Sequence, residues 1–225
     1  MKSARQAALL DQHCDYLKHI FRLQQVQSPV STSALAESLK VAPSTVTDTL
    51  KKLSQKGLIN YTPYHGITLT PKGEKLAVKA IRRHRIVERF LTDMLGFEWH
   101  EAHEEALRFE TQLSDEVERR LFVALNKPKV CPHGYPIPSK VEDVKVEETT
   151  LYSLEPGETA EVISVKDDEP ELLQFMASLG IKPGVKIKVV AKDPFKGPLQ
   201  AVVGRSRRTV GWHLANSIHV RKLGN

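Results

Sequence analysis

The first 75 residues contain the pattern that most restricts the fold of this chain. Two short segments with helical spacing of apolar residues, 33–39 and 44–55, are joined by a turn of about four residues. A further helical stripe at 12–25 precedes them, and the short runs 58–61 and 67–70 flank a turn that contains Pro and Gly. Three helices and a two-stranded hairpin in this order predict a winged helix-turn-helix module.

The segment 44–55 is the predicted recognition helix, because the second helix of such a module enters the major groove of DNA. Short polar residues near its start suit base edges or phosphates, and two lysines suit phosphates. These residues are Ser44, Thr45, Thr47, Asp48, Lys51 and Lys52. The hairpin tip at Tyr64 and His65 is a further candidate for contact with the DNA backbone or the minor groove. The alternative is a winged module used for protein contacts.

The charge distribution favours an anionic partner for the same part of the chain. The net charge is +6, from 33 Lys and Arg against 27 Asp and Glu. Residues 1–75 hold ten basic residues against five acidic ones, whereas 76–140 and 141–225 are nearly balanced. Nucleic acid is the commonest partner of such a basic surface, and a merely solvated lysine-rich face is the alternative.

Composition excludes several classes of protein. Hydrophobic residues make up 40% of the chain, so it can bury a core, and its apolar runs are far too short to cross a membrane. Only two cysteines are present, which excludes a fold stapled by disulfides. The start of the chain lacks the pattern of a signal peptide, and we therefore expect a cytoplasmic protein.

The middle of the chain is predicted to be helical and to pair two copies. Helical patterns cover 76–95, 99–113 and 115–125, with a break at Gly96-Phe97. A winged module does not need this much helix for itself. We therefore expect a homodimer, whose two-fold symmetry would match a palindromic operator.

The last third is predicted to be a small β-barrel of about five strands. A loop rich in proline, 127–138, leads to Val- and Ile-rich runs separated by Gly and Pro, with one helical stretch at 171–179. The predicted fold class is thus mainly α with a small β domain. The expected domains are 1–75 for DNA binding, 76–140 for dimerisation and metal binding, and 141–225 for a linker and the barrel.

Two pairs of residues in the helical region have metal-ligand chemistry. His84 and Glu88 are four apart, and His103 and Glu110 are seven apart, so each pair shares one face of its helix. Imidazole and carboxylate together suit Mn²⁺, Fe²⁺, Co²⁺, Ni²⁺ or Zn²⁺, and two packed helices can close a site around one ion. The alternative is two solvated helix faces, since such pairs are common.

Other candidate chemistry is weak. A single Cys-x-His at Cys131 and His133, with no second pair at zinc-finger spacing, indicates a residue pair that shapes its loop. No glycine-rich phosphate loop, nucleophile elbow or paired His-Glu-x-x-His is present, so we expect no enzyme.

Several segments together resemble the diphtheria toxin repressor family of metal-dependent transcriptional repressors. The segments are 83–91, 103–106, 113–121 and the run Cys-Pro-His-Gly-Tyr-Pro-Ile-Pro at 131–138. The segments 154–158, 179–184 and 194–199 resemble the SH3-like domain that these repressors share with ferrous-iron transport protein A. The resemblance covers essentially the whole chain. It implies an N-terminal winged helix, a helical domain that dimerises and holds two metal sites, and an SH3-like third domain.

The resemblance assigns metal ligands by position. It places an ancillary site at His84, Glu88 and His103, with a further ligand from 167–169 or Glu171 in the third domain. It places the primary site at Asp15 and Glu110, but Leu107 and Thr111 stand where the family usually has Cys or Glu and His. Either neighbouring residues compensate, or the ancillary site is the principal one. The neighbours considered are His13, Cys14, His19, His100 and Glu104.

The function that the resemblance implies is repression of metal-uptake genes, with the metal as corepressor. An aspartate at position 15 resembles the manganese-responsive branch of the family, so Mn²⁺ is the expected ion. The alternatives are an iron-responsive repressor that uses Fe²⁺, and a metal-binding adaptor that has lost DNA binding.

Overall fold

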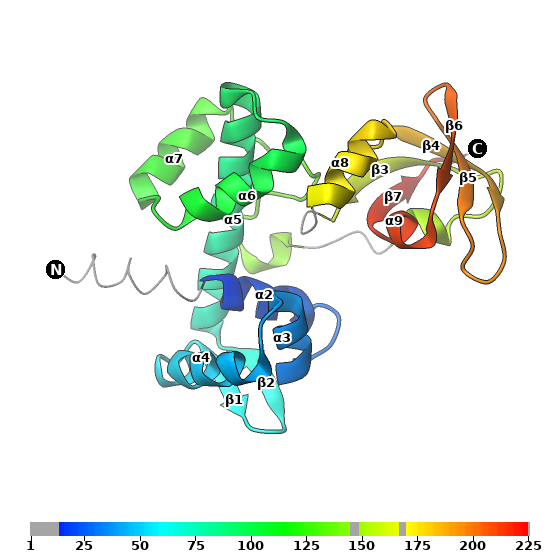
Figure 1. The fold of residues 1–225 in the computed structure, drawn as a ribbon. Coiled ribbons are helices and arrows are strands. Elements are labelled where there is room, and N and C mark those ends of the chain that lie inside the picture. Colours follow the sequence, from blue (N-terminus) through cyan, green and yellow to red (C-terminus); the bar gives the residue numbers. More distant parts are fainter. Residues whose placement is uncertain (1–13, 145–148, 167–169, 225) are drawn as a thin grey trace. The chain divides into compact units, whose positions relative to one another are not determined.

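The computed structural model describes residues 14–144, 149–166 and 170–224 of the chain (Figure 1). The chain divides into two compact units. The first, here called the winged unit, contains the described residues of 1–84, 107–119 and 138–144, and the second, the sheet unit, contains the described residues of 85–106, 120–137 and 145–225. No helix among the described residues is both long and apolar enough to cross a membrane.

The winged unit confirms the helix-turn-helix and hairpin pattern. Ser31 begins the second helix as its N-cap, and its hydroxyl accepts a hydrogen bond from the backbone N–H of Ala34 (3.0 Å). Pro43 lies in the first turn of the third helix, where its missing N–H costs nothing. The elements are α2 (Cys14–Gln24), α3 (Thr32–Leu39), α4 (Pro43–Gln55), β1 (Ile59–Thr62) and β2 (Gly66–Leu69).

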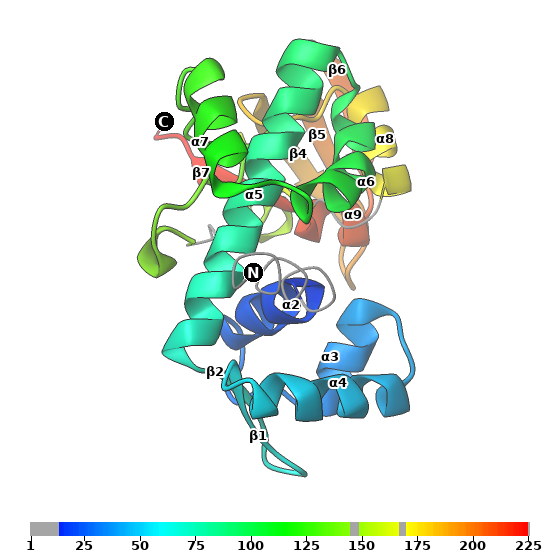
Figure 2. The ribbon, with the colours of Figure 1, turned by 90° about the vertical axis from the view of Figure 1, so that its left-hand side faces the viewer.

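The core of the winged unit lies between these helices and the hairpin. Ile20, Leu35, Leu50, Leu53 and Ile67 are completely buried there. The hairpin is antiparallel, with Ile59 opposite Leu69. Figure 2 shows α4 and the hairpin at the lower end of this unit, with α3 and α2 above α4. The face of α4 opposite its buried residues is therefore left open to solvent.

The long helix α5 (Pro71–Leu95) begins directly after the hairpin. The hydroxyl of Thr70 accepts a hydrogen bond from the N–H of Gly73 (3.2 Å), which caps the helix. Only a glycine fits at position 73, because a Cβ atom there would lie 2.0 Å from the carbonyl oxygen of Leu58 in the hairpin region. Helix α5 is thus held closely against the end of the wing.

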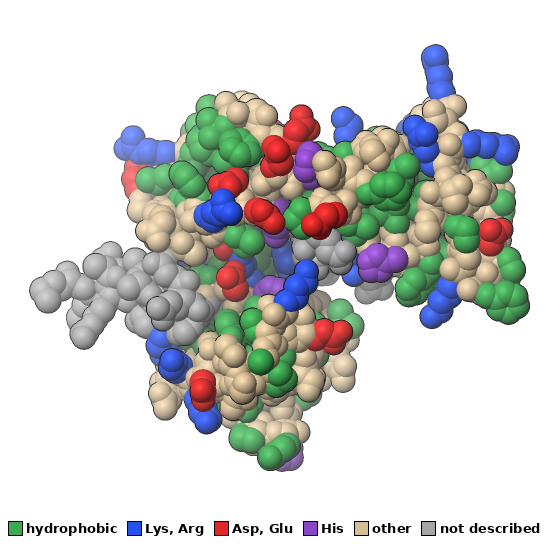
Figure 3. Space-filling view, viewed as in Figure 1, with side chains coloured by type: hydrophobic (Ala, Val, Ile, Leu, Met, Phe, Trp, Pro, Cys, Tyr) green, Lys and Arg blue, Asp and Glu red, His purple; other side chains and the backbone are tan. Residues whose placement is uncertain are grey.

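The other helices of the middle region agree with the predicted break and cap. Helix α5 ends before Gly96, which has φ +73°, and α6 (Trp99–Glu110) follows. Ser114 caps α7 (Asp115–Ala124), since its hydroxyl accepts a hydrogen bond from the N–H of Val117 (3.2 Å). No residue of α7 is buried, and Figure 3 shows hydrophobic side chains gathered over this helix.

The sheet unit contains one antiparallel sheet with strand order β6-β5-β4-β3-β7. Helix α8 (Pro170–Ser178) contributes Leu173 and Met176 to its core, where they meet Ile187 and Ala201. The strands are β3 (Thr159–Val165), β4 (Lys186–Lys192), β5 (Leu199–Val203), β6 (Ser206–Val210) and β7 (Ile218–Lys222).

The expectation of a closed barrel is wrong. Among the described residues, β6 pairs only with β5 and β7 only with β3, so these two strands form the two edges of an open sheet. The short helix α9 (Trp212–Asn216) connects them along the chain. The five strands and the predicted helix are present, and only the closure is missing.

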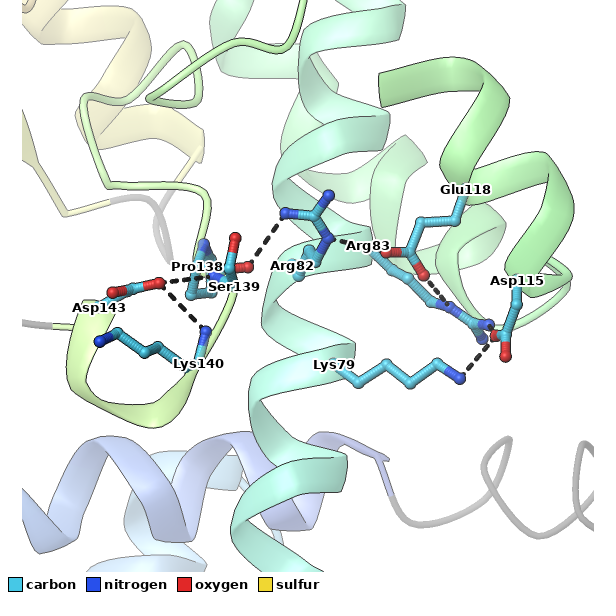
Figure 4. A network of polar contacts seen from close by, with 9 residues as sticks. All are labelled: Lys79, Arg82, Arg83, Asp115, Glu118, Pro138, Ser139, Lys140 and Asp143. Carbon is cyan, nitrogen blue, oxygen red and sulfur yellow. Dashed lines mark hydrogen bonds and ion pairs between the residues drawn. The ribbon is translucent and has the colours of Figure 1, made fainter. Parts of the chain in front are cut away.

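A network of ion pairs joins α5 to α7 in the winged unit (Figure 4). Glu118 accepts hydrogen bonds from Arg82 (2.9 Å) and Arg83 (3.1 Å) through its two carboxylate oxygens. Asp115 pairs with Arg83 and with Lys79, each at 2.5 Å. The Glu118 side chain is 12% exposed and that of Arg83 is 8% exposed, so this pair is largely removed from water.

The same network reaches the loop that follows α7. Arg82 donates a hydrogen bond to the carbonyl oxygen of Pro138 (3.1 Å). Further along this loop, the Asp143 carboxylate accepts hydrogen bonds from the backbone N–H groups of Ser139 (2.8 Å) and Lys140 (3.1 Å) (Figure 4). These contacts fix residues 138–144 within the winged unit.

We predict that Glu118→Gln lowers the free energy of unfolding by about 2 kcal/mol, because it leaves two largely buried guanidinium groups without a full counter-charge. The matched control is Glu116→Gln on the same helix, whose carboxylate pairs with the exposed Arg119. Its expected cost is below about 0.5 kcal/mol. Urea unfolding monitored by circular dichroism measures both, and equal losses would contradict the role of the network.

Candidate functional site

The recognition helix α4 presents most of its predicted DNA contacts to solvent. Val46, Leu50 and Leu53 are buried and fix the orientation of the helix. On the other face, the structure places the side chains of five candidates in exposed positions. These are Ser44, Thr45, Asp48, Lys51 and Lys52. An open face with two lysines fits contact with phosphates.

Two of the candidates have local partners. Thr47 is half-buried, and its hydroxyl donates a hydrogen bond to the carbonyl oxygen of Pro43 (3.0 Å). Asp48 and Lys51 are 3.7 Å apart, and both are well exposed, so this pair is weak and can be exchanged for a phosphate contact. At the hairpin tip, Tyr64 is fully exposed with φ +65°, and His65 beside it is also exposed.

The candidate metal centre is built around the carboxylate of Glu88. This side chain on α5 is completely buried, which is costly for a charge unless cations or donors surround it. Its Oε1 lies 3.3 Å from Nδ1 of His103 on α6 and 3.2 Å from Nδ1 of His133. His84 lies one turn before Glu88 on α5, and the ligand atoms of His84, Glu88 and His103 are within 4.8 Å of one another.

Cys131 and His133 also lie beside Glu88, a neighbourhood that the sequence-based expectation of a pair that shapes its loop did not include. The ligand atoms of Glu88, Cys131 and His133 lie within 4.8 Å of one another, and all three residues are buried. Sequence reasoning did not place them there, because the loop is far from Glu88 along the chain. The Cys-x-His spacing was the sequence signal for these two ligands. The third residue of the group, Glu88, is not close to them in the sequence. We call His84, Glu88, His103, Cys131 and His133 the Glu88 group.

The loop that carries Cys131 and His133 is rigidly held. The N–H of Gly134 donates to the carbonyl oxygen of Cys131 (2.9 Å), and the N–H of Cys131 donates to that of Tyr135 (2.9 Å). The carbonyl oxygen of His133 accepts from the N–H of Val165 in β3 (3.0 Å). The loop is thus tied to the sheet at the position of the histidine.

The ring of His133 is oriented by a backbone carbonyl. Its Nε2 lies 2.8 Å from the carbonyl oxygen of Trp99, which can only accept, so Nε2 carries the proton and Nδ1 faces Glu88. Burial by itself lowers the pKa of His133, but the neighbouring Glu88 carboxylate and the Cys131 thiol together outweigh it and raise the pKa well above its ordinary value. A metal-binding histidine is usually held through the N–H of one ring nitrogen, so that the other nitrogen can bind the ion. In His133 the carbonyl of Trp99 holds Nε2, which leaves Nδ1 in that position.

The Glu88 group fits a divalent transition-metal ion. Two sets of three candidate ligands share the Glu88 carboxylate: His84 and His103 add imidazole nitrogens in one, and Cys131 and His133 add a thiol and an imidazole in the other. A divalent cation held by either set would compensate the buried charge. Burial and the Glu88 carboxylate raise the pKa of the Cys131 thiol, although His133 opposes them. The thiol therefore needs a bound cation before it becomes a thiolate.

Asp15 and Glu110, the predicted primary ligands, are brought together through a lysine. The ammonium of Lys18 on α2 lies 3.0 Å from Oδ1 of Asp15 and also pairs with Oε1 of Glu110 at the end of α6. The other oxygen of Glu110 lies 2.6 Å from Nδ1 of His84. In the part of the chain that the structure describes, neither Asp15 nor Glu110 joins a group of three candidate ligands.

The pKa values of this cluster follow from its opposite charges. Burial would lower the pKa of Lys18, but Glu110 and then Asp15 outweigh it and the pKa is raised. Burial would raise the pKa of Glu110, but His84 and Lys18 outweigh it and the pKa is lowered. Lys18 is thus an ammonium and Glu110 a carboxylate at neutral pH.

The other candidates for a primary site do not gather around Glu110 as ligands. Leu107 is 38% exposed, and Thr111 lines a small cavity beside Glu110 together with Cys14. Burial and then Glu110 raise the pKa of Cys14 to about 11, so it stays a neutral thiol. His19 is bound to the hydroxyl of Ser38 instead (2.6 Å). His13 and 167–169 lie outside the described residues, and Glu171 is exposed at the start of α8.

Models of known protein families match three successive parts of the chain. The model of the iron dependent repressor N-terminal DNA binding domain matches residues 8–67. The model of the iron dependent repressor metal binding and dimerisation domain matches 70–139, and that of the FeoA domain matches 149–222. A DNA-binding winged helix followed by a metal binding and dimerisation domain defines the class of metal-dependent transcriptional regulators.

Individual relatives agree with these models. A diphtheria toxin repressor of Corynebacterium efficiens is 32% identical over 187 residues, which cover 78% of this chain and 81% of the relative. The iron-dependent repressor IdeR of Mycobacterium leprae is 28% identical over 221 residues, which cover 92% and 96%. The chain belongs to the diphtheria toxin repressor family of metal-dependent transcriptional repressors, whose members bind operator DNA and dimerise and are not enzymes.

Solved structures show the same fold. A manganese-dependent transcriptional repressor in complex with manganese is 34% identical, with a TM-score of 0.83, and the match covers 93% of this chain and 99% of the other. The manganese regulator SloR is 32% identical with a TM-score of 0.78, covering 93% and 98%.

We predict that Gly134→Ala displaces the loop that carries Cys131 and His133. Gly134 has φ +90°, and a Cβ atom there would lie 1.9 Å from the carbonyl oxygen of Ile163. The expected cost is about 2 kcal/mol of unfolding free energy, with weaker Mn²⁺ binding. In Gly211→Ala the new Cβ meets nothing within 4 Å, and the backbone has φ −64°. This control should keep the wild-type unfolding free energy in urea and the wild-type Mn²⁺ affinity in equilibrium dialysis. Equal losses in the two variants would contradict the prediction.

Proposed function

We propose that this chain is a homodimeric, cytoplasmic repressor that binds a palindromic operator when Mn²⁺ occupies the Glu88 group, and so shuts off a metal-uptake gene. The observation that carries the proposal is the buried Glu88 carboxylate, which faces imidazole nitrogens of His103 and His133 at 3.3 and 3.2 Å. A bound divalent ion supplies the positive charge that these donors lack.

The position of the ligands on α5 supports a link to DNA binding. His84 and Glu88 lie on the helix that starts immediately after the wing, where Gly73 packs against the carbonyl oxygen of Leu58. A shift of α5 therefore also displaces the hairpin against which it packs. Such linkage between ligand and DNA is typically worth about 1 to 3 kcal/mol, or about 5- to 150-fold in affinity.

Exposed apolar residues support dimerisation through the helical region. Helix α7 buries none of its residues, and its apolar residues Val117 and Val123 are about half exposed. Phe109, near the end of α6, is 51% exposed. Large apolar side chains left in water on helices of a soluble domain mark an interaction surface. A second copy of the chain supplies the partner that a palindromic operator requires.

The structure and the relatives bear on the choice of metal in different ways. Three structural relatives are manganese-dependent repressors or manganese regulators, which supports Mn²⁺. The second candidate is Fe²⁺, favoured by the thiol of Cys131 in the Glu88 group, since a soft sulfur donor suits later metals better than Mn²⁺. Relatives named iron-dependent repressors point the same way.

We expect Glu88→Gln to abolish the Mn²⁺-dependent tightening of operator binding, because it removes the buried negative charge that attracts the ion and that lies next to the other donors of the Glu88 group. His133→Ala should weaken Mn²⁺ binding at least about tenfold. The control is Glu104→Gln, an exposed carboxylate on α6 outside the Glu88 group. Fluorescence anisotropy with a duplex selected in the presence of Mn²⁺ measures operator binding. Wild-type behaviour of Glu88→Gln would reject the proposed centre.

A second prediction concerns the DNA surface. Lys51→Glu and Lys52→Glu should each weaken operator binding and lower the slope of log affinity against log salt by about one, because each removes a phosphate contact. Lys188→Glu, an exposed lysine on β4, makes the same charge change away from α4 and should leave the slope unchanged. Unaltered operator binding by Lys51→Glu and Lys52→Glu would reject α4 as the DNA surface. No operator binding by the wild type, with or without Mn²⁺, would favour a metal-binding adaptor over a repressor.

A further inference from the structure

The winged unit contains a protein cation at the point where the family resemblance implies a metal ion. Lys18 projects from α2, and its side chain is only 7% exposed. Its ammonium lies 3.0 Å from Oδ1 of Asp15 and pairs with Oε1 of Glu110, which is 92 residues away in the sequence. The two residues expected to share a metal ion thus share an ammonium.

The remaining donors that such an ion would need are missing. Leu107 has no ligand atom, and the hydroxyl of Thr111 is a poor substitute for an imidazole. The small cavity beside Glu110 is lined by Lys79 and Arg83 as well as by Thr111, and these two cations add to the positive charge near the carboxylate. Among the described residues, those around Asp15 and Glu110 therefore do not fit a divalent ion.

Glu110 has a different task in this arrangement. A carboxylate can only accept, so the 2.6 Å contact with His84 places the proton of this histidine on Nδ1. In the neutral ring, the lone pair that can bind a metal ion is then on Nε2 of His84. A carboxylate that holds one nitrogen of a histidine so that the other can bind metal is a common supporting arrangement. Lys18 in turn holds the carboxylate.

We propose that the Lys18 ammonium takes the place of a metal ion between Asp15 and Glu110, and that Glu110 is a positioning residue for His84 and not a metal ligand. The attachment of α2 to the end of α6 then needs no metal. The chain binds metal only at the Glu88 group, and this last clause rests on the proposed function.

The test counts Mn²⁺ ions bound per chain by equilibrium dialysis and elemental analysis, with Mn²⁺ as the only added metal. With Lys18 intact, Asp15→Asn should bind the same number of ions as the wild type, with an affinity within about twofold. Glu110→Gln should keep the same number at saturation but weaken binding about 10- to 100-fold, because His84 loses its orientation. Fewer ions bound by Asp15→Asn than by the wild type would overturn the proposal.

A gain-of-site variant gives the converse test. Lys18→Glu places a third carboxylate beside Asp15 and Glu110 and should raise the count by one Mn²⁺ per chain, with a larger Mn²⁺-dependent rise in Tm than the wild type shows. Lys18→Gln serves where Lys18→Glu does not fold: its Tm without metal should fall, and millimolar Mn²⁺ should restore part of the loss. No added ion in the first variant, or no loss of Tm in the second, would overturn the proposal.

Glu88→Gln separates this proposal from the proposed function. If the wild type and Glu88→Gln bind equally little Mn²⁺, the proposed metal centre fails. The Tm of metal-free Lys18→Gln still decides whether the ammonium holds Asp15 and Glu110 together, because that measurement needs no metal. An unchanged Tm would then reject the Lys18 proposal independently.

Discussion

The buried carboxylate of Glu88 is the constraint on which the functional part of the structure depends. A charge with no solvent exposure must be balanced by nearby cations or donors. Here α6 supplies His103, and the loop after α7 supplies Cys131 and His133. The proposed binding of a divalent cation depends on the burial and the held geometry of these groups. In the absence of such an ion, the raised pKa of His133 supplies a proton as partial compensation.

Local sequence patterns predicted most of the fold. The helix-turn-helix and hairpin follow from apolar spacing and from local caps such as Ser31, and the break of the long helix follows from Gly96. Strand β6 was harder to see, because four of its five residues are polar and it packs only at the edge of the sheet. Barrel closure depends on whether distant edges pair, and no local pattern reports this.

The metal centre was only half predictable for the same reason. His84 and Glu88 lie one helical turn apart, so their spacing alone indicated a shared face. The contribution of Cys131 and His133 depends on a contact between a loop and a helix far apart in the sequence. Lys18 went unnoticed because its partner Glu110 is 92 residues away in the sequence, and a lysine on an amphipathic helix is usually solvated. Family positions identified Asp15 and Glu110 but not the cation between them.

The most direct test of the account is the affinity of the wild-type chain for Mn²⁺, measured with and without the operator duplex at fixed salt. If the Glu88 group links metal to DNA binding, thermodynamic reciprocity requires the duplex to tighten Mn²⁺ binding by the same factor by which Mn²⁺ tightens operator binding. The account predicts a common factor of about 5- to 150-fold. Equal Mn²⁺ affinities in the presence and absence of operator would contradict it.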